Sequence, residues 1–94
     1  HYAAAKGGVI AFSKSLAREV ANDRIRVNVL SPGPLDTPML GAQTEESRRL
    51  IAERSPLGRL GTPNDVAQGI LYLVSEHSSW VTGHVLRVNG GSLI

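Results

Sequence analysis

Residues 25–34 have the sequence IRVNVLSPGP, and this stretch decides the fold. Its first six residues, Ile25–Leu30, are rich in β-branched side chains and form a short run, so they predict a strand. Ser31–Pro34 predict the end of that strand, because two prolines around one glycine oppose both a helix and a sheet ladder. We therefore expect a short strand that leads into an irregular loop at its carboxyl end.

The preceding residues, 2–22, predict an amphipathic helix. The apolar residues Val9, Phe12, Leu16 and Val20 recur at the spacing of one helix face. We expect this face to be buried. The helix begins at the first residue with no capping residue ahead of it, which suggests that residues upstream are missing.

Two further helices are expected after the loop. Thr44 can cap a short helix that ends near Arg54. Thr62, Pro63 and Asp65 predict a second helix, because they supply an N-cap, a proline at the first helical position and an acid three residues after the cap. This second helix is expected to end near Ser75 and to bury a face made of Val66, Ile70, Leu73 and Val74.

A second strand is predicted at His84–Val88, closed by Asn89-Gly90-Gly91. Strands that are separated by helices of this length predict right-handed crossovers and a parallel sheet, so the fold class is α/β. Two strands are too few for a parallel sheet, and we expect the first strand to pair with strands that this chain lacks.

Composition excludes several classes of protein. The 94 residues contain no cysteine, which rules out a disulfide framework and a thiolate metal site, and the three histidines have no metal-site spacing, so we expect no bound metal. A net charge of +2 is spread along the chain, which opposes nucleic-acid binding. No apolar run is long enough to span a membrane, and we expect a cytoplasmic protein without a membrane contact.

Tyr2 and Lys6 are the candidate catalytic residues. They lie four positions apart in the first predicted helix, so both side chains emerge on one face. A nearby cation stabilises a phenolate, which suits a tyrosine for general acid/base catalysis. The small residues of 3–8, Ala-Ala-Ala-Lys-Gly-Gly, would let another molecule approach the backbone. Close packing against another helix explains these small residues equally well.

Five segments together resemble the short-chain dehydrogenase/reductase family. They are HYAAAKGG at 1–8, RVNVLSPG at 26–33, GRLGTP at 58–63, VTG at 81–83 and VNGG at 88–91. The 3-oxoacyl-carrier-protein reductase branch and the sugar and steroid dehydrogenase branches are the most similar. The resemblance implies that residues 1–94 are the C-terminal part of one Rossmann-like domain with a doubly wound parallel sheet, and that the dinucleotide-binding half is absent.

The resemblance also implies an activity. Tyr2 would exchange a proton with a carbonyl or secondary alcohol substrate while hydride moves to or from NAD or NADP. Lys6 would assist Tyr2 and bind the nicotinamide ribose. The implied cofactor-binding residues are Tyr2, Lys6, Pro32, Gly33, Leu35 and Thr37. Residues 38–56 would form a substrate flap, and the full-length protein would be a homodimer or homotetramer.

The sequence departs from the family pattern in one respect. The glycine-rich phosphate loop, the asparagine and the catalytic serine of the family all precede the tyrosine, and these 94 residues contain none of them. We therefore expect the isolated chain to be a fragment with little activity. One alternative is a non-catalytic fragment that serves in assembly, and a second, which rests only on the basic isoelectric point, is an anion or nucleic-acid binder.

Overall fold

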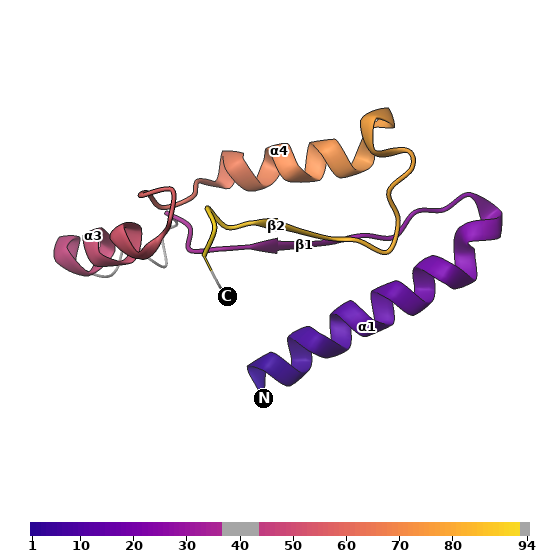
Figure 1. Ribbon diagram of the computed structural model, residues 1–94, viewed down its shortest axis with the longest axis horizontal. Coiled ribbons are helices and arrows are strands. Elements are labelled where there is room, and N and C mark those ends of the chain that lie inside the picture. The colour runs from indigo at the N-terminus through magenta and orange to yellow at the C-terminus, as the bar shows by residue number, and fades with distance from the viewer. Residues whose placement is uncertain (37–43, 93–94) are drawn as a thin grey trace.

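The computed structural model describes residues 1–36 and 44–92. The elements along the chain are α1 (Tyr2–Val20), the 3₁₀ turn η1 (Ala21–Asp23), β1 (Val29–Pro32), α3 (Glu45–Arg54), α4 (Pro63–Val74), the 3₁₀ turn η2 (Glu76–Ser78) and β2 (Val85–Val88). The two strands form a parallel sheet, with α4 on one side and α1 on the other (Figure 1). This arrangement confirms the α/β class, with two strands, two main helices and one short helix.

Strand β1 lies further along the chain than the sequence predicted. Val29 pairs with Val85, and Pro32 pairs with Val88, so the ladder includes a proline that we expected to end it. The backbone N–H groups of Val29 and Gly33 donate toward β2, at 2.9 and 3.0 Å. Donors alternate along a strand, so the missing N–H of Pro32 falls on the open edge of the sheet, where it costs no ladder bond.

Residues 25–28 precede the ladder, and side chains take part in most of their hydrogen bonds to the segment before β2. Asn28 donates from Nδ2 to the carbonyl of Val81 at 3.0 Å and accepts at Oδ1 from the N–H of His84 at 3.0 Å. The N–H of Val27 donates to Oγ1 of Thr82 at 3.1 Å. These side-chain bonds join the amino ends of the two strands together with one backbone bond, from the N–H of Gly83 to the carbonyl of Val27 at 2.8 Å.

Helix α4 covers the sheet where glycine allows close approach. A Cβ built at Gly69 would lie 2.9 Å from side-chain atoms of Leu30 and of Val88. The predicted cap is confirmed, because Thr62 accepts from the N–H of Asp65 and the Asp65 carboxylate accepts from the N–H of Thr62. The predicted buried face is wrong in part, since Ile70 and Val74 are exposed. Gly69 takes the central contact with the strands.

The expected buried face of α1 is also wrong in part. Val9 is 57% exposed and Phe12 is 67% exposed, and Ala17 is the one buried residue of the helix. The amino-terminal half of α1 diverges from the strands, as Figure 1 shows, so nothing in the described chain covers its outer face. Leu16 and Val20 of the predicted face are half-buried. The other covered residues of α1 are Lys6, Ile10, Ser13 and Ala17.

A polar cluster joins the carboxyl end of α4 to the start of β1. The guanidinium of Arg26 donates to Oγ of Ser78 at 3.0 Å and to the carbonyl of Leu73 at 2.8 Å. Ser78 is fully buried, and its hydroxyl donates to the same Leu73 carbonyl at 2.9 Å. A buried polar group without a hydrogen bond lowers the stability of the fold, so these bonds hold the end of α4 and the segment before β1 together.

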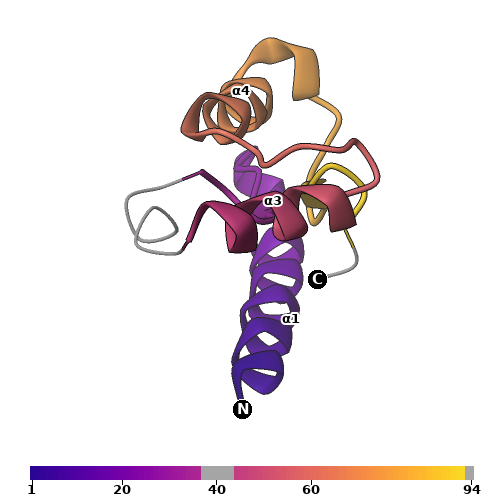
Figure 2. The same ribbon diagram turned by 90° about the vertical axis from the view of Figure 1, so that its left-hand side faces the viewer.

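Helix α3 projects from the carboxyl end of the sheet, away from α1 along the long axis of the molecule (Figures 1 and 2). Its predicted cap is confirmed, because Thr44 accepts from the N–H of Ser47 at 3.1 Å. An ion pair between Arg48 and Asp36 ties the helix to the segment that follows β1. Of the predicted flap, only residues 44–56 lie within the described chain.

Candidate functional site

Tyr2 and Lys6 line one cavity with the carboxyl end of β1. The cavity has a volume of about 360 Å³, and its walls come from the first three turns of α1 and from all four residues of β1. Tyr2 is 73% exposed, so its phenol is open to an incoming molecule, whereas Lys6 is half-buried. The residues that line the cavity are Tyr2, Ala5, Lys6, Val9, Ile10, Val29, Leu30, Ser31 and Pro32. The cavity therefore combines two polar groups with an apolar wall.

The cofactor residues predicted at the end of β1 and in the loop after it do not all line this cavity. Pro32 lines the cavity beside Tyr2 and Lys6, whereas Gly33 and Leu35 lie beyond its wall. Gly33 packs against β2, and Leu35 forms an isolated parallel bridge with Gly61.

In that bridge, the carbonyl of Pro34 accepts from Gly61 at 3.0 Å and the N–H of Asp36 donates to Gly61 at 2.7 Å. Within the described residues, no hydrogen bond uses the backbone groups of Leu35 itself. Thr37, the last predicted cofactor residue, lies outside the described residues.

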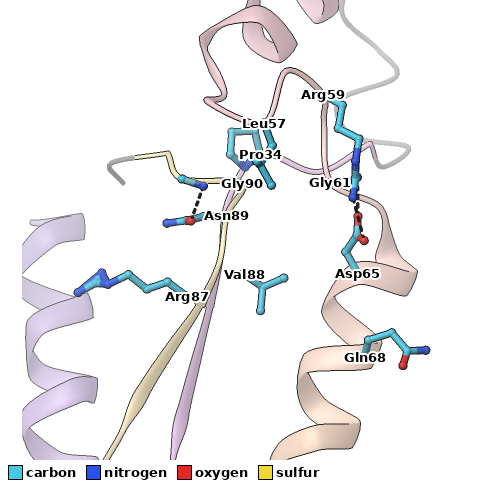
Figure 3. Close-up of a pocket in the computed structure, with 11 residues that line it drawn as sticks. Pro34, Leu57, Arg59, Gly61, Asp65, Gln68, Arg87, Val88, Asn89 and Gly90 are labelled. Atoms are coloured by element: carbon cyan, nitrogen blue, oxygen red, sulfur yellow. Dashed lines mark hydrogen bonds and ion pairs between the residues drawn. The ribbon is translucent and has the colours of Figure 1, made fainter.

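A second cavity, of about 430 Å³, lies between α4 and the turn after β2 (Figure 3). Pro34, Leu57, Asn89 and Gly90 are among its lining residues. Along β2, Val88 points toward α4 and Arg87 extends toward α1, so these neighbours belong to opposite faces of the sheet (Figure 3). The sequence analysis did not identify this cavity, although the glycine pair after the second strand was a signal for a close backbone contact.

Two charged residues that line this second cavity, Arg59 and Asp65, form an ion pair with each other. Arg59 donates to both carboxylate oxygens of Asp65, at 2.7 and 3.2 Å. This bond, together with the backbone N–H of Thr62, holds the pKa of Asp65 well below its usual range. The same carboxylate raises the pKa of Arg59. The pair thus holds the loop before α4 against the first turn of that helix, and its two charges offset each other, so it offers little free charge to a ligand.

Comparison with known proteins decides the family. The family described as enoyl-(acyl carrier protein) reductase matches residues 1–92. A 3-oxoacyl-(acyl-carrier-protein) reductase from Thermotoga maritima is 48% identical over 94 residues, which are 100% of this chain and 38% of that protein. The chain belongs to the short-chain dehydrogenase/reductase family. The resemblance proposed from the five motifs is confirmed.

Other members of the short-chain dehydrogenase/reductase family match a similar share of this chain and of their own length. An acetoacetyl-CoA reductase from Acinetobacter is 46% identical over 91 residues, which are 97% of this chain and 37% of that protein. A crystal structure of a 3-oxoacyl-(acyl-carrier protein) reductase from Brucella melitensis superposes with a TM-score of 0.92 at 41% identity and covers 100% of this chain and 35% of that one. The chain spans less than two fifths of the length of these relatives.

Two kinds of site are absent from the part of the chain that the structure describes. No cluster of three or more His, Asp or Glu side chains is placed to hold a metal ion in residues 1–36 and 44–92. Over the same ranges, no helix is both long enough and apolar enough to cross a membrane.

Proposed function

We propose that this chain carries the proton-transfer residues of an NAD(P)-dependent oxidoreductase that interconverts a 3-oxoacyl thioester and its secondary alcohol. The observation that supports this proposal is that Tyr2 and Lys6 line one cavity with the whole of β1, its carboxyl end included. Ligands in open α/β folds bind at such ends. The relatives named above act on 3-oxoacyl groups carried by acyl carrier protein or on acetoacetyl-CoA, which are all 3-oxoacyl thioesters.

Tyr2 acts as the general acid in the direction of reduction. Its exposed phenol donates a proton to the carbonyl oxygen of the substrate, and in the reverse direction the phenolate takes the proton from the alcohol. Lys6 lies one helical turn further along α1, where its positive charge stabilises the phenolate. The apolar side chains of Val9 and Ile10 form one wall of the cavity.

The donors of this cavity fit the nicotinamide end of a dinucleotide. The ammonium of Lys6 and the phenol of Tyr2 are suited to ribose hydroxyls. Pro32 lines the cavity beside these groups. Beyond the cavity wall, Gly33 would allow close approach, the backbone of Leu35 is suited to a carboxamide, and Thr37 would add a hydroxyl. NAD or NADP would supply the hydride when bound.

We also propose that the full-length protein is a cytoplasmic homodimer or homotetramer. Large apolar side chains remain uncovered on both sides of the sheet, with Phe12 67% exposed on α1 and Trp80 98% exposed after η2. Exposed apolar side chains of this size favour association. An assembly role without catalysis is the alternative that the same surfaces support.

The experiment that tests the function measures turnover by the full-length native polypeptide. Acetoacetyl thioesters are added with NADPH or NADH, and the loss of the reduced nicotinamide absorbance is followed. We expect turnover with one cofactor and the reverse reaction with a 3-hydroxyacyl thioester. Oligomerisation with no nucleotide binding and no turnover would contradict the proposal and favour the assembly role.

A further inference from the structure

The turn Asn89–Gly91, which follows β2, contacts two segments that the proposed function uses. One segment is the loop Pro32–Asp36, which carries the proposed cofactor residues Gly33 and Leu35. The other is the segment 55–57, directly after α3. The proton-transfer role proposed for α1 gives neither contact a function.

The contact with the loop is close. The N–H of Gly33 donates to the carbonyl of Val88 at 3.0 Å, which holds the loop against the end of β2. A Cβ built at Gly33 would lie 2.7 Å from Cβ of Asn89 and 2.8 Å from its Cα. The second atom belongs to the backbone, so any side chain at Gly33 would displace the turn.

The contact with α3 is equally close. The carbonyl of Gly90 accepts from the N–H of Leu57 at 3.0 Å and from the hydroxyl of buried Ser55 at 3.4 Å. A Cβ built at Gly90 would lie 2.6 Å from Oγ of Ser55, and one built at Gly91 would lie 3.0 Å from Pro56. Both glycines have positive φ, at 61° and 90°, so they suit this position in conformation as well as in size.

The side chain of Asn89 holds the turn in one shape. Its Oδ1 accepts from the N–H of Gly91 at 3.0 Å, a bond drawn in Figure 3, and its Nδ2 donates to the carbonyl of Ser92 at 2.6 Å. The carbonyl of Asn89 also accepts from the N–H of Ser92 at 3.0 Å. Because these bonds hold the turn in one shape, a displacement of the loop Pro32–Asp36 should also displace residues 55–57.

We propose that the turn Asn89–Gly91 is a positioning element that couples the cofactor loop Pro32–Asp36 to α3. A ligand that orders the loop also orders the carboxyl end of α3, because both segments rest on the same three residues. Asn89 acts through its neighbours and is a positioning residue. The inference rests on the proposed function only in taking the ligand to be a nicotinamide cofactor.

The first test needs no cofactor. In the full-length native polypeptide, Gly33→Ala forces Asn89 to move, and we expect amide hydrogen exchange at residues 50–58 to become at least about fivefold faster. Ser78→Ala is the matched control, because it destabilises the opposite end of the sheet without touching the turn. Unchanged exchange at residues 50–58 in Gly33→Ala would overturn the coupling.

The second test measures how the cofactor acts on α3. NADP(H) or NAD(H), whichever binds more tightly, should slow exchange at residues 50–58 in the wild type. Asn89→Ala should abolish this protection. Ser78→Ala should retain it, a pattern that general destabilisation would not produce.

The outcomes separate the coupling from the proposed function. If the cofactor binds and residues 50–58 are not protected in the wild type, or are protected equally in Asn89→Ala, the coupling is wrong. If neither cofactor binds at all, the proposed function fails, and the Gly33→Ala exchange experiment still decides whether the turn couples the loop to α3.

Discussion

At the scale of single residues, the chain supplies a matched pair of lysines for testing the cofactor contact. Lys6 lines the cavity beside Tyr2, whereas Lys14 lies on the exposed side of the same helix. We expect Lys6→Met to raise the KM for NAD(P)H and lower kcat, each by about tenfold or more, because a charge-assisted hydrogen bond and a charge near the phenolate are both lost. Lys14→Met should change neither constant by more than about twofold.

The measurement is steady-state kinetics with the cofactor varied at saturating substrate. Equal effects of the two lysine substitutions would contradict the role of Lys6.

Asp65 gives a prediction for the dependence of stability on pH. Because Arg59 and the N–H of Thr62 lower its pKa, the ionised carboxylate stabilises the folded state above the ordinary aspartate pKa of about 3.9. This stabilisation is lost as the pH falls through the lowered folded-state pKa. Asp65→Asn should therefore be less stable than the wild type at pH 7 and should lose less stability between pH 7 and pH 3.

Urea unfolding at the two pH values measures this difference, with Asp23→Asn as a control at an exposed carboxylate. Parallel losses in the wild type and in Asp65→Asn would be inconsistent with the proposed role of the Arg59–Asp65 pair.

At the scale of elements, the two N-caps are expected to differ in effect. Thr62 caps α4, which packs on both strands, so Thr62→Ala should lower the free energy of unfolding by about 1 kcal/mol. Thr44 caps α3, which does not pack closely on the strands, so Thr44→Ala should speed hydrogen exchange within α3 and leave global unfolding nearly unchanged. Thr62→Ser keeps the acceptor and should restore most of the stability.

Thermal unfolding and amide exchange of the three variants provide the check. If Thr44→Ala lowered the free energy of global unfolding as much as Thr62→Ala does, the expected difference between the two caps would be wrong.

Helix boundaries were predictable from the sequence because caps act locally. Thr44 and Thr62 each lie next to the backbone group that they satisfy, and both predicted starts are correct. The bounds of β1 were not predictable in the same way, because its register depends on Val85–Val88, more than fifty residues away. Asn28 replaces a ladder bond with its side chain, which no local β propensity reveals.

The candidate site was predictable to a similar degree. Tyr2, Lys6 and Pro32 line one cavity. The helix-face spacing was enough to place Tyr2 beside Lys6, whereas Pro32 was added to them by the family resemblance. The turn Asn89–Gly91 was not assigned a function, because its importance comes from contacts with Gly33 and Ser55 that are distant in sequence. The buried faces of α1 and α4 were predicted from periodicity, which marks an apolar stripe but does not say which stripe meets the strands.

At the scale of the whole molecule, the uncovered apolar surface predicts association. Phe12→Glu should reduce the native mass of the full-length protein toward that of a single subunit, because a charge would enter an apolar contact. Lys14→Glu makes a charge change on the polar side of the same helix and should leave the assembly intact. Light scattering after size-exclusion chromatography measures the mass. An unchanged mass in Phe12→Glu would exclude the outer face of α1 from the contact.

The most direct test of the central claim uses the two tyrosines of the chain. Tyr2 lines the cavity of Lys6, whereas Tyr72 lies on α4 on the other side of the sheet. In the full-length native polypeptide, Tyr2→Phe should lower kcat for 3-oxoacyl thioester reduction by about a hundredfold or more, because it removes the general acid. Tyr72→Phe should retain kcat within about twofold of the wild type. Undiminished kcat in Tyr2→Phe would contradict the account.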